Sequence, residues 1–426
     1  MKHIIIYPII FFFFISTELF PQIENENVNQ PQYADSVEFY RSQYKDKGTW
    51  EYIVSFPGTV VSLPLVLFFK MQEHVVGYVY KNKLVPRTID FFTSEDSNRG
   101  IEPTYSSRSG GGVKFYQKGF LNPESKLNLK ASGSFKGRQH YQIELKRIRF
   151  FQRILEFNFM SEYRFLLGEA FYGVGPYTKP SGRTDYDHEI IVAEAGLGIH
   201  FNNQLIFEVQ AGLERHNIFG SDESNHPSIK QFYNSVNLPG LETEVQIARF
   251  QTGFNYDSRN RLGNPSSGKE AVLSANIFRD INENLYNFWQ ISAEVKQYIH
   301  LFKNRVIALR IAGETIEPFK DRQIPFYYLS SFGRHETIRG FDRGRFRDKD
   351  LLLASIEYRI PLWYSIDTEL FADAGQVSNN IFKNFRNENF QFGYGIGWRL
   401  WNSKDLIAIL EFALSSERFR IYFELN

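Results

Sequence analysis

The feature that most constrains the fold is a period-2 alternation of apolar and polar residues, repeated along most of the chain. In 205–213 every odd position is apolar or small, and Glu208 and Gln210 lie between them. The segments 127–135 and 419–425 show the same pattern. Successive side chains of a β-strand point to opposite faces, so each segment has one apolar and one polar face. Many of these segments reach ten residues or more, whereas strands of soluble proteins average about 5–6 residues.

No apolar run is long enough for a membrane-spanning helix, which needs about 20 residues. The longest runs are 4–15 and 58–69. Mean hydropathy is low, at −0.35, yet aromatic residues make up 17% of the chain. A transmembrane β-barrel satisfies both conditions, because it is apolar only on alternate residues and carries aromatic girdles.

Counting the alternating segments gives sixteen strands, an even number that suits a bacterial outer-membrane barrel. The sequence therefore predicts an all-β fold: a sixteen-stranded antiparallel transmembrane β-barrel over 110–426, preceded by a short N-terminal extension. The predicted strands start near Gly111, Lys126, Tyr141, Leu155, Glu189, Leu205, Gln246, Glu270, Trp289, Arg305, Pro325, Leu351, Thr368, Phe390, Ile407 and Arg418. The longest connections, near 173–188, 216–244 and 330–350, are expected on the extracellular side.

The N-terminal residues have the pattern of a secretory signal. Lys2 precedes the apolar run 4–15, which is of secretory length, so we predict a signal peptide over 1–21. Residues 22–109 are expected to form a periplasmic or interfacial extension. Its apolar run 58–69 is interrupted by Pro64 and suits either an interfacial plug or the core of a small periplasmic segment.

Motifs for covalent chemistry are missing from the sequence. There is no Cys, no Gly-x-Ser-x-Gly and no His-Glu-x-x-His. The segment 263–269 imitates a phosphate-binding loop, but it contains Pro265 and is followed by Glu270, which favours a hairpin turn. The net charge of +1 gives no support to nucleic-acid binding. We therefore expect no enzyme activity, catalytic residue, metal or cofactor, and no nucleic-acid partner.

A short motif lies in the connection after the eleventh predicted segment. It consists of Ile338, Arg339, Gly340 and Phe341. Four other segments accompany it in the chain, namely FYGVG at 171–175, FNYDSRNRLGNPSSGKEAVLS at 254–274, LLLASIEYRIPLW at 351–363 and TELFADAGQV at 368–377. Together, in this order and spacing, they resemble the BamA/TamA superfamily, also called the bacterial surface antigen family.

The resemblance implies a sixteen-stranded outer-membrane barrel whose sixth extracellular loop folds into the lumen. It further implies that Glu357 and Asp373 point inward near the loop tip and pair with Arg339, whose planar guanidinium suits carboxylates. Gly340 would allow the sharp turn and Phe341 would wedge against the wall. The alternative is that Arg339 is one solvated charge of a basic loop.

The resemblance also implies a weak seam between the first and last strands, which can open sideways toward lipid. The predicted first strand begins with Gly110, Gly111 and Gly112, and glycine weakens a strand. The predicted last strand contributes Phe419, Ile421 and Phe423. The alternative is that the glycines form a turn into an ordinary closed barrel.

The implied function is assembly or translocation of outer-membrane or surface proteins in the bacterial outer membrane. A passive pore or transporter, or an accessory structural subunit, is the alternative. Outer-membrane lipids, client outer-membrane proteins and other subunits of an assembly machinery are the expected partners. Family members usually carry periplasmic POTRA modules, and 22–109 is long enough for one but lacks the β-α-α-β-β pattern. The chain therefore resembles a short member of the family without POTRA modules.

Overall fold

The computed structural model describes residues 94, 96, 98–106, 109–151, 153–221, 224–333, 336–363, 366–401 and 406–425. The predicted signal peptide and almost all of the predicted extension 22–109, including the apolar run 58–69, lie outside the described residues. In the described ranges no helix combines the length and the apolar character required to cross a membrane.

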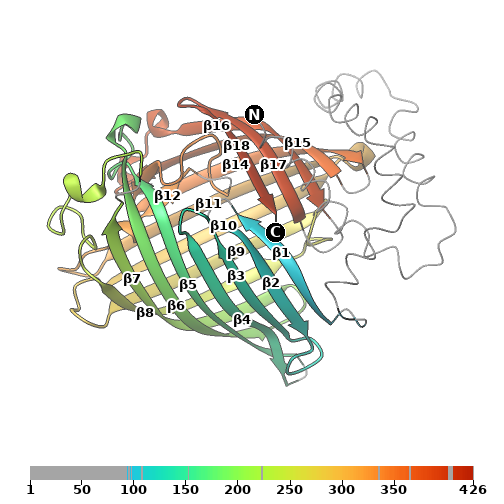
Figure 1. Cartoon of the computed structure of the whole chain (residues 1–426). Helices are drawn as coiled ribbons and strands as arrows, with labels where there is room; N and C mark the ends of the chain where they lie inside the picture. The colour runs from blue at the N-terminus through green and yellow to red at the C-terminus, as the bar shows by residue number, and fades with distance from the viewer. Residues whose placement is uncertain are drawn as a thin grey trace, which may run out of the picture.

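The described strands confirm the predicted fold class. Sixteen antiparallel strands form one closed wall, in which the first strand pairs with the last (Figure 1). The wall strands are β1 (Arg99–Ser106), β2 (Gly110–Lys118), β3 (Lys126–Gly133), β4 (Gln139–Phe150), β5 (Leu155–Phe171), β6 (Thr184–His200), β7 (Leu205–Gly220), β8 (Val245–Asp257), β9 (Gly268–Asp280), β10 (Phe288–His300), β11 (Val306–Pro318), β14 (Asp350–Trp363), β15 (Ile366–Ser378), β16 (Gln391–Trp401), β17 (Leu406–Ser415) and β18 (Phe419–Leu425).

Short elements occupy the connections between these strands. A two-stranded sheet of β12 (Ser330–Phe332) and β13 (Phe346–Asp348) lies in the connection between β11 and β14. The helical turns are η1 (Pro180–Gly182), η2 (Ile229–Gln231), η3 (Phe302–Asn304), η4 (Phe326–Tyr328), α5 (Ile381–Asn384) and η5 (Asn387–Asn389).

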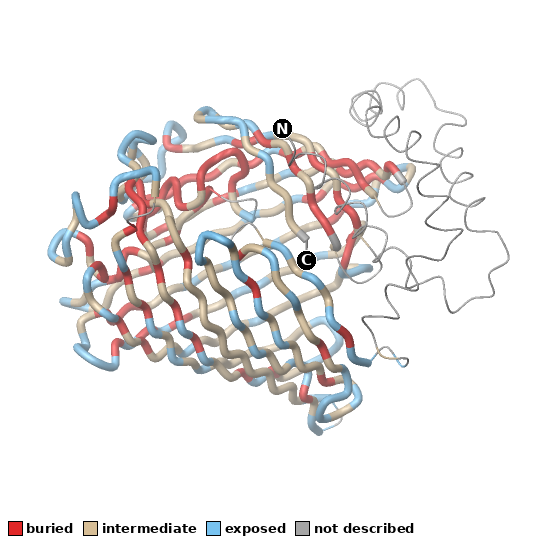
Figure 2. Tube along the Cα trace, viewed as in Figure 1, coloured by how far each residue is buried: buried red, intermediate tan, exposed pale blue. Residues whose placement is uncertain are grey.

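The alternation of the sequence sorts side chains between the two faces of the wall. Leu213 of β7 pairs with Ala248 of β8 on the outer face, and Leu213 is 57% exposed. The next pair, Glu214 with Ile247, faces the lumen, where Ile247 is fully buried. Figure 2 shows much of the wall as intermediate or exposed. The buried segments gather around β14 to β17 and in the connection between β11 and β14.

Two details differ from the predicted strands, and their effects on the count cancel. The wall begins with β1 at Arg99, so the predicted start of the barrel at residue 110 is too late. Pro103 argued against a strand in this segment, because proline is rare in strands that pair on both sides. The structure tolerates it because, among the described residues, β1 pairs with β18 through only one register pair and so resembles an edge strand. The segment predicted to start at Pro325 is not a wall strand. It forms η4 and β12, whose Phe326 and Phe332 are each 1% exposed.

The connection 319–349 between β11 and β14, here called the lumen loop, folds into the barrel. Its Phe326 packs with inward-facing Phe171, Tyr186 and Ile218 of β5, β6 and β7. A second apolar cluster contains Ile324 of the loop together with Ile247, Phe278, Phe288 and Ile316 of the wall. Apolar side chains thus hold the lumen loop against the inner wall from two sides.

Candidate functional site

The conformation of the lumen-loop tip depends on Gly340 and on an apolar cluster to which the loop itself contributes. Gly340 has φ +93°, a left-handed conformation that non-glycine residues rarely adopt. Ile338 and Phe341, on either side of the Arg339–Gly340 turn, are fully buried with Phe332, Phe346 and Val377. The turn therefore directs Arg339 away from this cluster and toward the inner faces of β14, β15 and β17.

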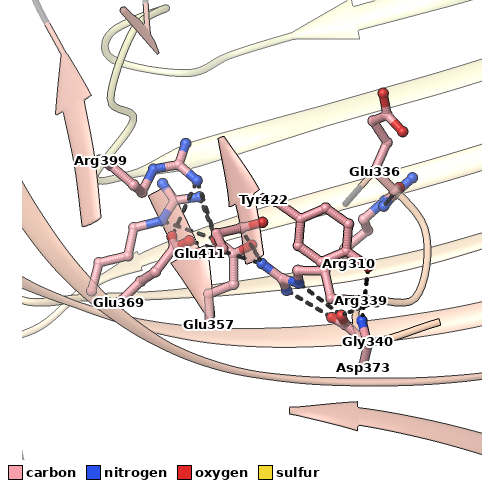
Figure 3. Close-up of polar contacts among 11 residues, drawn as sticks. Arg310, Glu336, Arg339, Gly340, Glu357, Glu369, Asp373, Arg399, Glu411 and Tyr422 are labelled. Carbon is pink, nitrogen blue, oxygen red and sulfur yellow. Dashed lines mark hydrogen bonds and ion pairs between the residues drawn. The ribbon is translucent and has the colours of Figure 1, made fainter. Parts of the chain in front are cut away.

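Arg339 forms a dense set of charge-assisted hydrogen bonds (Figure 3). Its Nε and Nη2 donate to the two carboxylate oxygens of Asp373, each at 2.7 Å, and its backbone N–H donates to the same carboxylate at 3.0 Å. Nη1 donates to Glu411 Oε1 at 2.9 Å and to Glu357 Oε1 at 3.3 Å. The guanidinium also lies 3.5 Å from the ring centroid of Phe371. Both acidic residues that the resemblance implied, Glu357 and Asp373, thus contact Arg339, which is 4% exposed.

Burial acts to lower the pKa of Arg339, since it disfavours the charged form. Hydrogen bonding to Asp373 and the negative charges of Asp373, Glu411 and Glu357 outweigh burial and hold this pKa well above its ordinary value. Arg339 is therefore a permanent cation at the loop tip. Removing its partners would leave a desolvated charge.

The sequence reasoning missed four of the charged residues around Arg339. Arg359 donates to Glu357 Oε2 at 2.6 Å, and Arg399 donates to Glu369 Oε2 at 3.2 Å. We name the whole group the anchor cluster, and it consists of Arg339, Arg359, Arg399, Glu357, Glu369, Asp373 and Glu411. Three guanidinium groups thus face four carboxylates. The available signal was an isolated charge at an inward-facing position of an apolar strand, as in Leu410-Glu411-Phe412.

The lumen loop is also bound to the last hairpin of the barrel. The hydroxyl of Tyr422 on β18 accepts from Gly340 N at 3.0 Å and donates to Phe341 O at 3.2 Å. Ser415 Oγ at the end of β17 donates to Gly340 O at 2.8 Å. Arg345, 1% exposed, pairs with Glu417 at 2.8 Å between these two strands. The lumen loop therefore contacts β17, β18 and the turn between them.

A second polar contact lies on the opposite wall. Tyr328 of η4 donates from its hydroxyl to Glu214 Oε2 at 2.5 Å and lies 2.9 Å from His216 Nε2. His216 in turn contacts His188 at 3.0 Å between ring nitrogens, and both histidines are buried. Across the described part of the chain, no group of three or more His, Asp or Glu side chains has the arrangement that could hold a metal ion.

The seam between β1 and β18 is the least extensive pairing of the wall. Among the described residues one Cα pair, Tyr105 with Leu425, sets the register, whereas β1 and β2 share eight pairs. The rings of Tyr105 and Phe423 lie 6.3 Å apart across the seam. Phe419 and Ile421 are exposed on the outer face of β18, at 52% and 58%.

The glycines predicted for the seam lie elsewhere. Gly110, Gly111 and Gly112 belong to β2 and pair with β1 on one side, while Gly111 and Gly112 also pair with β3 on the other. The predicted seam is therefore wrong in this half, because an additional strand precedes them. A Cβ on Gly112 would lie 2.3 Å from the carbonyl oxygen of Ala131, so close approach between β2 and β3 explains this glycine.

Comparison with known proteins connects this architecture to a family. Residues 101–403 match the Omp85 superfamily domain. The fold is similar to that of BamA from Haemophilus ducreyi lacking POTRA domains 1–3, with a TM-score of 0.57, 18% identity, and coverage of 77% of this chain and 70% of that one. CdiB from Acinetobacter baumannii is similar at a TM-score of 0.47 and 14% identity, with 76% of this chain and 57% of that chain covered.

Proposed function

The chain belongs to the Omp85 superfamily and is a β-barrel of the bacterial outer membrane, and from this membership we propose that it assembles or translocates outer-membrane or surface proteins. The proposed work needs no covalent chemistry. Client strands would be received at the seam between β1 and β18, and lipids and other subunits of an assembly machinery would be the remaining partners.

The observation that carries this proposal is the combination of a short wall and a minimal pairing at the seam. β1 and β18 have 8 and 7 residues, whereas β5 and β6 have 17 each. With a rise of about 3.3 Å per residue and a tilt of about 40°, the strands at the seam rise about 20 Å and the long strands about 43 Å. The apolar band of such barrels is about 25 Å tall. A wall lower than this band favours local thinning of the bilayer beside the seam.

The pairing at the seam supports the same proposal. Strand edges are templates for pairing with another chain. One register pair between β1 and β18 leaves few ladder hydrogen bonds to break on opening. The contacts of the lumen loop with the β17–β18 hairpin would keep β18 in position while β1 moves.

The alternative of a passive pore or transporter has less support. The lumen loop contributes to three apolar clusters and to the anchor cluster inside the barrel, and these contacts occupy space that a steady water-filled channel requires. The third alternative, an accessory structural subunit, shares the fold and differs only in having no clients of its own.

Depletion of the protein, followed by quantitation of folded outer-membrane proteins, separates these alternatives. Loss of many barrels is expected for general assembly, and loss of one or a few for a dedicated translocator. Unchanged barrels with altered permeability to small solutes would contradict the proposal and favour the pore.

A cysteine lock tests the seam directly, because the chain contains no Cys that could interfere. Tyr105→Cys with Leu425→Cys joins the two Cα partners of the seam. Glu102→Cys with Lys114→Cys, a paired position of β1 and β2, is the matched control. The seam lock should abolish assembly activity and reduction should restore it. Full activity of the oxidised seam variant would contradict opening at this place.

A further inference from the structure

The outer face of β5 to β9 contains an apolar groove of about 520 Å³. Register explains its shape. In one row across the strands, Ala195 pairs with Ala211, and these two are flanked by Phe159 and Phe250. Two small residues between two aromatic rings leave a channel in the outer surface.

The next row toward the loop end extends the groove. It contains Ala193, Leu213 and Ala248, followed by Arg279 of β9. Behind the floor, on the lumen side of the wall, inward-facing Glu194 and Arg249 form an ion pair. The groove opens outward, toward the acyl chains of the membrane.

Arg279 gives the groove a charged end. Its side chain is exposed, it lines the groove, and its guanidinium lies 4.1 Å from the ring centroid of Phe319. Within the described part of the chain, no carboxylate lies within ion-pair distance of Arg279. By contrast Arg215, the outward cation one row higher, has Glu244 at 3.4 Å and Glu189 at 3.6 Å.

We propose that this groove binds an acyl chain of an anionic phospholipid, whose phosphate pairs with Arg279. A cation on the lipid face costs free energy that grows with depth in the bilayer, so its presence at the end of an apolar groove requires a counter-charge. The guanidinium fork matches phosphate geometry and binds it with two parallel hydrogen bonds. Small residues supply the channel for the chain, and the aromatic rings of Phe159 and Phe250 supply its sides.

Native mass spectrometry of the full-length protein, released from a mild detergent, tests this lipid site. The probes are dimyristoyl phosphatidylglycerol, the zwitterionic dimyristoyl phosphatidylcholine, and inorganic phosphate. The variants are Arg279→Gln, which removes the cation, and Ala211→Trp, which fills the groove. The controls are Lys383→Gln, an exposed cation on α5, and Ala293→Trp, an exposed small residue on the outer face of β10. Heat-modifiable migration verifies that each barrel is folded.

The wild-type protein and both controls should retain phosphatidylglycerol at one site and prefer it to phosphatidylcholine. Arg279→Gln should bind phosphatidylglycerol about tenfold more weakly, the loss expected for one charge-assisted contact. Ala211→Trp should also bind it more weakly, because the indole occupies the space of the acyl chain. Inorganic phosphate alone should not compete, because the acyl chain supplies part of the affinity. Equal retention by Arg279→Gln and the wild type, or equal binding of the two lipids, would overturn the proposal. Loss of a co-purified protein rather than a lipid in Ala211→Trp would overturn it in favour of a protein partner.

Discussion

Replacement of Arg339 by methionine should release the lumen loop from the wall. Arg339→Met keeps much of the side-chain volume but removes the bonds to Asp373, Glu411 and Glu357. The anchor cluster then holds four carboxylates against the two guanidinium groups of Arg359 and Arg399. Breaking a buried ion pair by removing one partner costs about 3–5 kcal/mol, because the remaining charge stays desolvated. That cost falls on the docked state and raises the population of the undocked loop about a hundredfold to a few thousandfold.

Trypsin cleavage of the lumen loop in the folded barrel measures this population. Arg343, Arg345, Arg347 and Lys349 remain as cleavage sites in the variant. When opening and closing are fast, cleavage follows the equilibrium population of the open state. Mass spectrometry of the fragments should therefore show cleavage at these sites at least a hundredfold faster than in the wild type.

A surface arginine provides the control for Arg339→Met. Arg386 pairs with Glu388 at 3.2 Å, but their side chains are 64% and 68% exposed. Exposed pairs contribute about 0–1 kcal/mol, so Arg386→Met should leave cleavage of the lumen loop unchanged. Equal cleavage rates in Arg339→Met and Arg386→Met would refute the reasoning that the anchor cluster holds the loop.

Three further changes test separate parts of the site. Gly340→Ala should lower the barrel's free energy of unfolding by about 1–3 kcal/mol, because φ is +93° and a Cβ would lie 2.9 Å from the carbonyl carbon of Leu414. In the control Gly313→Ala the new Cβ would have no neighbour nearer than 3.8 Å, so the free energy of unfolding should change little. Heat-modifiable migration, recorded against temperature, compares both variants with the wild type. Glu411→Gln should leave the loop at least as protected from trypsin as in the wild type, since it removes the excess negative charge of the anchor cluster and keeps an oxygen that can accept from Arg339. Asp373→Asn should expose the loop, because an amide cannot accept the two parallel hydrogen bonds from Nε and Nη2. The reverse order would contradict these roles. Tyr328→Phe loses the hydrogen bonds to Glu214 and His216 and should raise the rate of trypsin cleavage within 319–332 about tenfold. Tyr327→Phe is the control, because the Tyr327 hydroxyl has no hydrogen-bond partner among the described residues.

The sequence was sufficient to predict the wall, because one apolar and one polar face per strand is a requirement of the barrel itself. It failed for β1, where Pro103 and Gly100 interrupt the pattern in a strand of 8 residues. It also failed for the segment after Pro325. Phe326 and Phe332 are an even number of positions apart, as two side chains on one face of a wall strand would be, but they are buried inside the barrel. Period alone does not distinguish a side chain that faces lipid from one that faces an enclosed loop.

The sequence predicted some residues of the anchor cluster and missed others, for a related reason. The turn at Gly340 and the pairing of Arg339 with Glu357 and Asp373 followed from a resemblance that preserves residue order. Glu369, Arg399 and Glu411 belong to the anchor cluster because their inward-facing positions on neighbouring strands lie at the same height along the barrel axis. That height follows from the register of β15, β16 and β17, and the sequence does not specify it.

The order in which the anchor cluster is synthesised has a consequence for folding. Arg339 precedes Glu357, Asp373 and Glu411 by 18, 34 and 72 residues. Its charge is therefore neutralised in full only after β17 has joined the wall, and contacts this distant in sequence form late. Until then the loop tip is a cation without its complete set of counter-charges. Docking of the loop thus marks the completion of the C-terminal third of the barrel, and a chain truncated before Glu411 would close its wall poorly and leave its lumen open.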